Sequence, residues 1–469
     1  MRDRVILYSL ALLLAGCTVG PEYQRPKVAI PQNFRAPAPL SEGGVASIGD
    51  LKWFEVFGDE TLQALIRTAL ASNYDLRDAV VRVEEARANV GLKRSNQIPN
   101  LAASGNVGVN RLSRDGQTVL RETVLPSQNR TFGSASFALL SFEVDLWGKL
   151  RRSTEAARAS LLGAEENRKV VVTTVVSEVA TAYLTLCKLD YELDVSRRTL
   201  LTREQSLELT RSRQRGGVGT LLDLRQAEQL VETAAQTIPG IRQQIEQAEN
   251  QINLLLGQSP GGVPRGCKFG SGYLPPQVPP GIPSRLLERR PDIRAAEQSL
   301  IAANAQIGVA RAAYFPQISL SGFLGGQSTQ LSSLFNGPHS AWSLVPQVSQ
   351  PIFTAARLKS NLKITEAERQ RALVQYEKTI QTAFAEVSNA LFAHERVRES
   401  RERQEALVSA LRDRLRLAYL RYRGGVDTQL NALDADRDLF SAELALAQTR
   451  LDESLTVVQL YRALGGGWQ

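Results

Sequence analysis

Residues 87–101 read RANVGLKRSNQIPNL, and residues 304–318 read NAQIGVARAAYFPQI. The two stretches align without a gap at an offset of 217 positions. A second match follows at an offset of 208, where RGGVGT at 215–220 meets RGGVDT at 423–428. The chain therefore carries one structural plan twice, and each copy must bury its apolar face against something. Such a plan fits a duct or a scaffold better than a catalytic pocket.

Bulk composition excludes several classes of protein. The chain has 469 residues, 43% of them hydrophobic and 22% charged, which is ordinary for a folded protein. The net charge is +8, but basic residues alternate with acidic ones, as in RVRESRER at 396–403, which is typical of a solvated helix face and not of a nucleic-acid site. The two histidines, His339 and His394, belong to no cluster with metal-ligand spacing. We therefore expect no metal, no cofactor, no nucleic-acid partner and no enzymatic activity.

The N-terminus is typical of a bacterial lipoprotein signal. Arginines precede an apolar run at 5–15, which is shorter than the roughly 20 residues that span a bilayer. The run ends in Leu-Ala-Gly-Cys at 14–17, so cleavage after residues 1–16 leaves Cys17 as an acylated first residue. The alternative is an ordinary secretory signal with a chance cysteine. A strap rich in Pro and Gly follows and completes the segment 17–58.

Two further cysteines remain in the mature chain, Cys187 and Cys267. Two residues 80 positions apart imply no disulfide framework. Cys187 lies in a helical run, and we expect it to be a packed small hydrophobe.

Apolar and small polar residues alternate in two regions, at about 100–142 and about 316–352, which predicts two strand hairpins. Pro346 is awkward for a central strand because it cannot donate to the ladder. The strand lengths fit outer-membrane strands, although soluble hairpins would alternate in the same way. Four strands cannot close a barrel, and lipid tolerates no open sheet edge. If the strands lie in a bilayer, several chains must pool them.

A very long helix is predicted after each hairpin. Residues 149–214 and 355–422 contain no proline and carry apolar or small residues at alternating spacings of 3 and 4. At about 1.5 Å per residue, each would reach about 100 Å, and so narrow an apolar seam favours coiled-coil packing. The Gly-Gly reversals return a second helix antiparallel to the first.

These patterns give the expected division of the chain. We predict a signal peptide, the acylated strap, a first repeat with a coiled-coil hairpin, a Pro/Gly linker, a second repeat with its own hairpin, and a short tail. In order, these are 1–16, 17–58, 59–256 (hairpin 149–256), 257–285, 286–464 (hairpin 355–464) and 465–469.

From Cys17 to Leu464 the chain resembles the TolC-like outer-membrane efflux proteins, in their acylated OprM-like branch. The most diagnostic stretches are CTVGPEYQRP at 17–26, LLERRPDI at 286–293 and DLWGKLR at 145–151, together with the two RGGV reversals. The resemblance implies an α+β membrane protein with an internal two-fold repeat. It implies a homotrimer whose chains pool four strands each into a twelve-stranded β-barrel, continued by a long α-helical barrel in the periplasm.

The same resemblance implies a function. It describes a lipid-anchored channel in the outer membrane of a Gram-negative bacterium, which is a passive exit duct for small toxic compounds or drugs. An inner-membrane RND-type transporter supplies the energy, and a periplasmic adaptor protein connects the two. A type I protein secretion duct and a non-conducting periplasmic coiled-coil tether stay open as alternatives.

The resemblance also assigns site residues. Adaptor docking falls on the helix-hairpin tips, although their glycines are also needed simply to turn the chain. The periplasmic gate falls on Tyr422, Asn431 and Asp434, where Asn431 stands in place of one of the family's acids and Asp427 in place of a basic partner. The tip residues are Gly216, Gly217, Val218, Gly219, Thr220, Gly424, Gly425, Val426, Asp427 and Thr428.

Overall fold

The computed structural model describes residues 18–28, 31, 34–35, 47–111, 129–267, 269, 283–334 and 336–468. The chain divides into two compact units, each assembled from several segments. The strand unit comprises Met1–Lys27, Val83–Ala164 and Ala296–Tyr376, and the hairpin unit comprises Val28–Arg82, Glu165–Ala295 and Glu377–Gln469. Each unit takes segments from both repeats, so the division by sequence repeat stays a prediction.

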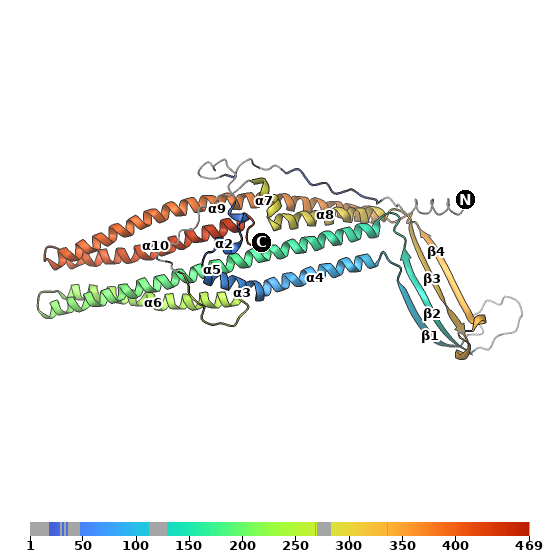
Figure 1. The fold of residues 1–469 in the computed structure, drawn as a ribbon, viewed down its shortest axis with the longest axis horizontal. Coiled ribbons are helices and arrows are strands. Elements are labelled where there is room, and N and C mark those ends of the chain that lie inside the picture. The colour runs from blue at the N-terminus through green and yellow to red at the C-terminus, as the bar shows by residue number, and fades with distance from the viewer. Residues whose placement is uncertain are drawn as a thin grey trace. The chain divides into compact units, whose positions relative to one another are not determined.

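The helices occur in pairs of equal length, which Figure 1 labels along the chain. The first pair has 22 residues in each helix, the second 67 and the third 35. Both ends of every pair keep the offset of 217 or 208 residues, so the predicted repeat is present in the secondary structure. The pairs are α4 (Tyr74–Ser95) with α8 (Pro291–Ala312), α5 (Lys149–Arg215) with α9 (Arg357–Arg423), and α6 (Leu221–Leu255) with α10 (Gln429–Ala463).

Shorter elements flank these pairs. Their bounds are η1 (Ile48–Asp50), α2 (Trp53–Val56), α3 (Glu60–Ser72), α7 (Pro283–Arg289), η2 (Leu331–Ser333) and η3 (Gly337–His339). Among the described helices, α5 is long and apolar enough to cross a membrane by composition, but more than half of its apolar window is buried within the chain. A core helix passes the same test, so we assign it no membrane span.

Four antiparallel strands form one sheet in the strand unit, in the order β1-β2-β3-β4 (Figure 1). The central β2–β3 pair joins a strand of the first repeat to a strand of the second. Strands β1 and β4 each have a single neighbour, so both are edge strands. Pro346 lies within β4, opposite Leu320, so the predicted strand forms despite its proline. The bounds are β1 (Leu101–Arg111), β2 (Asn129–Glu143), β3 (Gln317–Ser328) and β4 (Ser340–Ser349).

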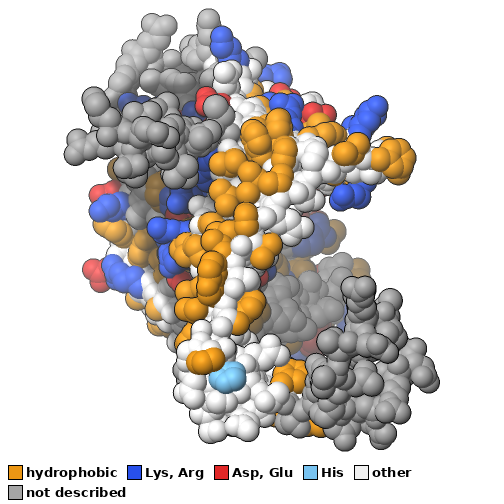
Figure 2. Space-filling model, turned by 90° about the vertical axis from the view of Figure 1, so that its right-hand side faces the viewer, with side chains coloured by type: hydrophobic (Ala, Val, Ile, Leu, Met, Phe, Trp, Pro, Cys, Tyr) orange, Lys and Arg blue, Asp and Glu red, His pale blue; other side chains and the backbone are white. Residues whose placement is uncertain are grey.

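The sheet has one apolar face and one face of mostly small, polar residues. A single cross-strand row on the apolar face joins Ala103, Phe137, Leu324 and Trp342. Its large side chains are solvent-exposed, and Figure 2 shows hydrophobic side chains gathered over the strands. On the opposite face, Glu143 at the end of β2 pairs with Ser319 and is the one charged residue among the strand positions whose side chains are described. The other residues of this face are Ala102, Ser104, Asn106, Gly108, Phe132, Ser134, Ser136, Ala138, Gln317, Ser319, Ser321, Phe323, Gly325, Gln327, Ala341, Ser343, Val345, Gln347 and Ser349.

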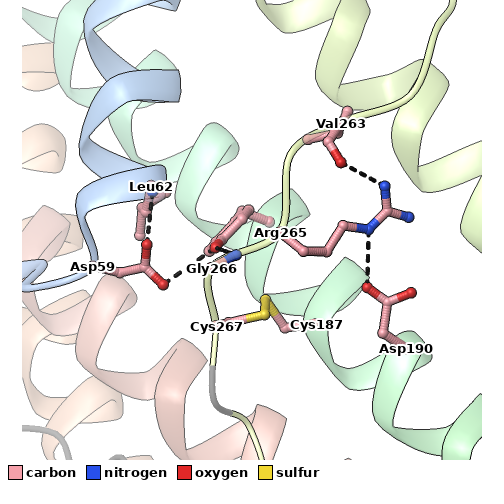
Figure 3. Close-up of a disulfide and its surroundings, with 9 residues drawn as sticks. Asp59, Leu62, Cys187, Asp190, Val263, Arg265, Gly266 and Cys267 are labelled. Atoms are coloured by element: carbon pink, nitrogen blue, oxygen red, sulfur yellow. Dashed lines mark hydrogen bonds and ion pairs between the residues drawn. A yellow bond between two sulfur atoms is a disulfide. The ribbon is translucent and has the colours of Figure 1, made fainter.

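The expectation that Cys187 is a free, packed thiol was wrong. Its side chain is buried, at 2% exposure, but its Sγ forms a disulfide with Cys267 across 80 residues of sequence (Figure 3). The linker that begins after α6 returns to α5, and cysteine spacing alone does not reveal such a return. The bond agrees with the export that the N-terminal signal predicts, because disulfides persist in oxidising compartments.

Hydrogen bonds hold the linker beside this disulfide (Figure 3). The Gly266 backbone N–H donates to the Tyr183 hydroxyl at 3.1 Å, and that hydroxyl donates to Asp59 at 3.2 Å. Burial, helped by the Asp59 carboxylate, raises the pKa of Tyr183 to about 12, so the phenol keeps the proton that it donates. Arg265 completes the attachment through Nε to Asp190, at 3.1 Å. The linker is therefore fixed to α5 at three points.

Candidate functional site: the two helix reversals and the helices behind them

The first reversal, between α5 and α6, is a Schellman turn. The Gly217 N–H donates to the Gln214 carbonyl and the Val218 N–H to the Arg213 carbonyl, both at 3.0 Å. Gly217 has φ +73°, which an L side chain rarely adopts, although a Cβ there would meet nothing within 4 Å. Glycine is therefore required by the backbone angle alone.

The second reversal, between α9 and α10, repeats this turn. The Gly425 N–H donates to the Tyr422 carbonyl and the Val426 N–H to the Arg421 carbonyl, both at 3.1 Å. Gly425 has φ +75°, close to the value of its counterpart. The shared motif explains why Arg-Gly-Gly-Val occurs twice in the sequence.

The two reversals differ in how the following helix is capped. Thr220 caps α6 with a capping box, in which its Oγ1 accepts from the Asp223 N–H and Asp223 accepts from the Thr220 N–H, both at 3.0 Å. At the second reversal, the side chain of Thr428 makes no capping bond to α10. The preceding residue instead accepts from the Thr428 backbone N–H.

Asp427 is that preceding residue. Its carboxylate accepts from Arg421 Nε at 2.9 Å, from the Thr428 N–H at 2.8 Å and from Asn431 Nδ2 at 2.7 Å. These bonds, led by the one from Arg421, lower the pKa of Asp427. The carboxylate thus bonds the backbone N–H of the N-cap residue, as Asp223 does at the first tip. It also holds the amide of Asn431, one of the predicted gate residues.

Apolar side chains project from both tips. Val218 is 73% exposed and Val426 is 67% exposed. The first turn of each following helix adds further exposed leucines. These are Leu221 and Leu222 in α6 and Leu430 in α10.

Tyr422 joins three helices. Its hydroxyl donates to Gln429 Oε1 in α10 at 3.2 Å, and Gln429 Nε2 donates to Thr210 Oγ1 in α5 at 2.7 Å. The Arg213 guanidinium lies 4.8 Å from the centre of the Tyr422 ring. A polar chain thus runs between the two hairpins, and the sequence had indicated only its tyrosine.

Within one chain, the three predicted gate residues do not meet. Tyr422 bonds Gln429, Asn431 bonds Asp427, and the half-buried Asp434 pairs with Arg437 at 3.2 Å. Each therefore has its own partner.

Sequence reasoning missed the most deeply buried charges behind the tips. Arg203 Nε in α5 lies 2.6 Å from Asp436 Oδ2 in α10, and both side chains are nearly inaccessible. The internal repeat did contain a signal for this pair. At the offset of 208, the residue of the second copy that corresponds to Arg203 is Leu411. A charge at a position where the other copy has a core leucine could have been noticed.

The lipidation residue, Cys17, lies outside the described residues, but residues 18–28 of the strap are described. In the strand unit, the Val19 N–H donates to the Trp147 carbonyl at 3.0 Å, and Asn304 donates to the Pro21 carbonyl at 3.0 Å. Tyr23 donates to Glu297 at 3.0 Å. The strap is thus bonded to the turn after β2 and to α8. In the part of the chain that the structure describes, no group of His, Cys, Asp and Glu side chains could hold a metal ion.

Comparisons with known proteins agree with this architecture. The family model described as outer membrane efflux protein matches residues 65–258 and 282–466. The outer membrane protein OprJ of Pseudomonas aeruginosa is 37% identical over 469 residues, which cover 98% of this chain and 95% of OprJ. The cation efflux system protein CusC of Escherichia coli O6:H1 is 35% identical over 472 residues, which cover 99% of each chain.

The fold of this chain is also similar to that of a solved outer membrane channel. The open state of the Neisseria gonorrhoeae MtrE outer membrane channel superposes with a TM-score of 0.86 at 33% identity, covering 97% of this chain and 99% of that one. The chain belongs to the outer membrane efflux protein family.

Proposed function

We propose that three copies of this chain form the exit channel of a tripartite efflux pump in the outer membrane of a Gram-negative bacterium. The channel is passive. An inner-membrane transporter of the RND type drives export, and a periplasmic adaptor connects the two. The observation that carries this proposal is the sheet in the strand unit, with its exposed apolar face, its opposite face of mostly small polar residues and its two edges without a strand partner.

The sheet is suited to lipid on one side and to water on the other. Most of its large exposed side chains lie on the apolar face, and the opposite face carries mainly Ser, Gln, Ala and Gly, with Phe323 and Val345 as its exposed large apolar residues. Within one chain, β1 and β4 leave rows of backbone donors and acceptors without a strand partner. A bilayer cannot satisfy such groups, so β1 of one copy pairs with β4 of the next until the barrel closes. Three copies give twelve strands.

The hairpin unit supports the same assembly. Long helices of a lone chain leave apolar side chains in water, and neighbouring copies would bury them. The exposed examples in the hairpin unit include Leu201, Leu209, Leu407, Leu417 and Leu420.

The helix reversals would be the docking sites for the adaptor. At each reversal, an exposed valine projects from a hydrogen-bonded turn, and the first turn of the following helix adds exposed leucines. The gate would lie just behind them, around Tyr422, Asn431 and Asp434. Three copies of the half-buried Asp434 around one axis would repel anions.

The cargo would be small toxic compounds or drugs, selected mainly by the pump. CusC is named as a cation efflux protein, so relatives of similar identity already differ in what they export. The acyl chains on Cys17 would anchor each copy as well, since each buried CH₂ contributes about 0.8 kcal/mol.

Dye accumulation tests this function. We would delete the gene for this chain in a host that lacks other exit channels and follow retention of a fluorescent efflux dye. Deletion should raise retention, and re-expression should lower it when adaptor and pump are present. Unchanged retention in all strains would reject the efflux channel. A tether would also pass no current in a planar bilayer under any condition.

A further inference from the structure

The strands lead into the long helices at two junctions in the strand unit, one in each repeat. The first junction, residues 143–155, leads from β2 into α5, and the second junction, residues 351–363, leads from β4 into α9 (Figure 1). At the first junction, each of three basic residues has an acidic partner within the chain. The pairs are Lys149 with Glu143 at 3.1 Å, Arg151 with Asp145 at 3.4 Å, and Arg152 with Glu155 at 2.8 Å. The first junction is therefore electrically balanced.

The second junction carries basic residues but no acid. At the offset of 208, two of the three cations are retained and all three acids are lost. The retained cations are Arg357 and Lys359, and the acids are replaced by Pro351, Phe353 and Lys363. The residues Arg357, Lys359 and Lys363 are exposed, and none of them forms an ion pair with another residue that the structure describes. Three positive charges are thus left without a counterion.

Helix stability does not account for these charges. Lys359 and Lys363 are four positions apart in α9, so they lie on the same side of the helix, where like charges repel. The first junction has Arg151 and Glu155 at the same two positions, and these attract. The first turn of α9 has no acid, and cations there also oppose the helix dipole. An anion from outside the chain would offset both effects.

The next copy in the proposed barrel does not supply that anion from the adjoining strand. There, the edge of β4 lies beside β1 of the neighbouring copy, and β1 follows α4. The stretch 91–111, which runs from the last turn of α4 to the end of β1, contains no acid, and α4 ends with Lys93 and Arg94 in its last turn. Both sides of the boundary between copies therefore contribute positive charge.

Large apolar side chains lie beside the charges of the second junction. Ile352 is 94% exposed and Phe353 is 89% exposed, directly after β4. Val348, at 67% exposure, extends the apolar face of the sheet to the same end of the strand. Exposed apolar groups next to unpaired lysines and arginines are typical of a surface at the membrane interface. The apolar groups enter the acyl-chain boundary there, and the cations meet anionic headgroups.

We infer that the second junction binds anionic phospholipids, such as phosphatidylglycerol, in the periplasmic leaflet of the outer membrane. Ile352 and Phe353 enter the acyl-chain boundary, and the three cations bind the headgroup phosphate. The inference rests on the proposed channel, because it requires the sheet to lie in the outer membrane. It adds the class of lipid that the channel selects at the periplasmic end of its barrel.

Native mass spectrometry of purified full-length trimers tests this site by measuring the Kd of phosphatidylglycerol and that of phosphatidylethanolamine. The wild type should bind phosphatidylglycerol about tenfold more tightly, because each basic residue near an anionic lipid strengthens binding several-fold. The double variant Lys359→Gln, Lys363→Gln should lower this preference to about twofold or less. The double variant Lys359→Arg, Lys363→Arg retains both charges and should retain the preference.

The matched control is the double variant Arg158→Gln, Arg371→Gln. These arginines are exposed residues of α5 and α9 in the same unit of the chain. Arg371 lies about 12 Å further along α9 than Lys363. The control loses as many positive charges as the glutamine variant of the two lysines, but its lipid preference should equal that of the wild type.

Four outcomes overturn the lipid site. In the first, the wild type binds both lipids equally. In the second, the glutamine variant of the two lysines keeps the wild-type preference. In the third, the control loses the preference as much as that variant does. In the fourth, that variant no longer forms trimers although the control does, which would assign the junction to a contact between copies. If the wild type itself forms no trimers, it is the proposed channel that fails and not the lipid site alone.

Discussion

Cys187 in α5 is bonded to Cys267 in the linker between the two repeats, although 80 positions separate them. The bond fixes the linker to a helix of the first repeat. Arg265 and Gly266, the two residues before Cys267, reinforce it through Asp190 and Tyr183. Several measurable consequences follow from this and from other contacts of the chain.

Replacing either cysteine of this pair by serine should destabilise the protein. Loop-closure entropy for a separation of 80 residues gives an upper value of about 4.5 kcal/mol. Thermal unfolding of purified protein measures the loss, and limited proteolysis should then cut the linker sooner. Reduced wild-type protein is the control and should behave like Cys267→Ser. Identical unfolding midpoints for oxidised and reduced wild type would contradict a stabilising bond.

Glycine in place of Ala356 should stabilise the chain. Ala356 has φ +66°, and its counterpart in the first repeat, 208 positions earlier, is Gly148 with φ +76°. Removing a Cβ from such a backbone should gain about 1 kcal/mol. The reverse change, Gly148→Ala, should destabilise, because its Cβ would also come within 2.8 Å of Thr18 Cγ2. The two shifts in unfolding midpoint must have opposite signs.

Acidification should destabilise the fold at His394, because protonation puts a charge on a half-buried ring between α9 and α10. The Thr456 hydroxyl donates to the Glu453 carbonyl, so His394 Nδ1 carries the hydrogen that it shares with Thr456 at 2.9 Å. Burial lowers the pKa of His394 below 6.5. A depressed histidine pKa means that the unfolded chain takes up the proton first. The contribution of neutral His394 to the free energy of unfolding is therefore complete above 6.5, the pKa in the unfolded chain. It is lost as the pH falls from there through the lowered pKa in the folded protein.

The matched variant for this effect is His394→Gln, which cannot titrate. The difference in unfolding midpoint between about pH 7.5 and about pH 5.5 should be smaller in the variant than in the wild type. Equal pH dependence in both proteins would show that His394 does not contribute.

Charges at the hairpin tips should block the adaptor without unfolding the chain. Val218→Asp and Val426→Asp place a carboxylate at exposed positions, so the fold should tolerate them. The double variant should bind the adaptor at least about tenfold more weakly, a loss of about 1.4 kcal/mol, as measured by surface immobilisation of purified trimers. Leu201→Asp, exposed but well before the tips, would be expected to affect assembly instead. Unchanged adaptor affinity in the tip variant would exclude these turns as the docking sites.

The sequence predicted what repetition and periodicity encode. Constant offsets anticipated the paired helices, and the alternation around Leu101 and Ile318 anticipated the two faces of the sheet. Both are local patterns, so neighbouring residues suffice to indicate them.

Contacts between distant segments were beyond such patterns. Arg203 and Asp436 are 233 positions apart, and Cys187 meets Cys267 only because the linker turns back. The sequence separation of neither pair indicates that its two residues are in contact. The resemblance to a family supplied the positions of the gate residues but neither of these two pairs. For Asn431 it supplied a position, but the bond to Asp427 depends on the aspartate that this chain carries there in place of a basic residue.

Cross-linking of the sheet edges tests the central claim of a shared barrel most directly. Val107→Cys in β1 would be combined in turn with Trp342→Cys, Leu344→Cys or Val348→Cys in β4, all on the apolar face. After oxidation in outer membranes, at least one pair should give a covalent band of three chains on a denaturing gel, and no single replacement should do so. Single-chain bands from every pair, with the protein present in the outer membrane, would contradict the barrel.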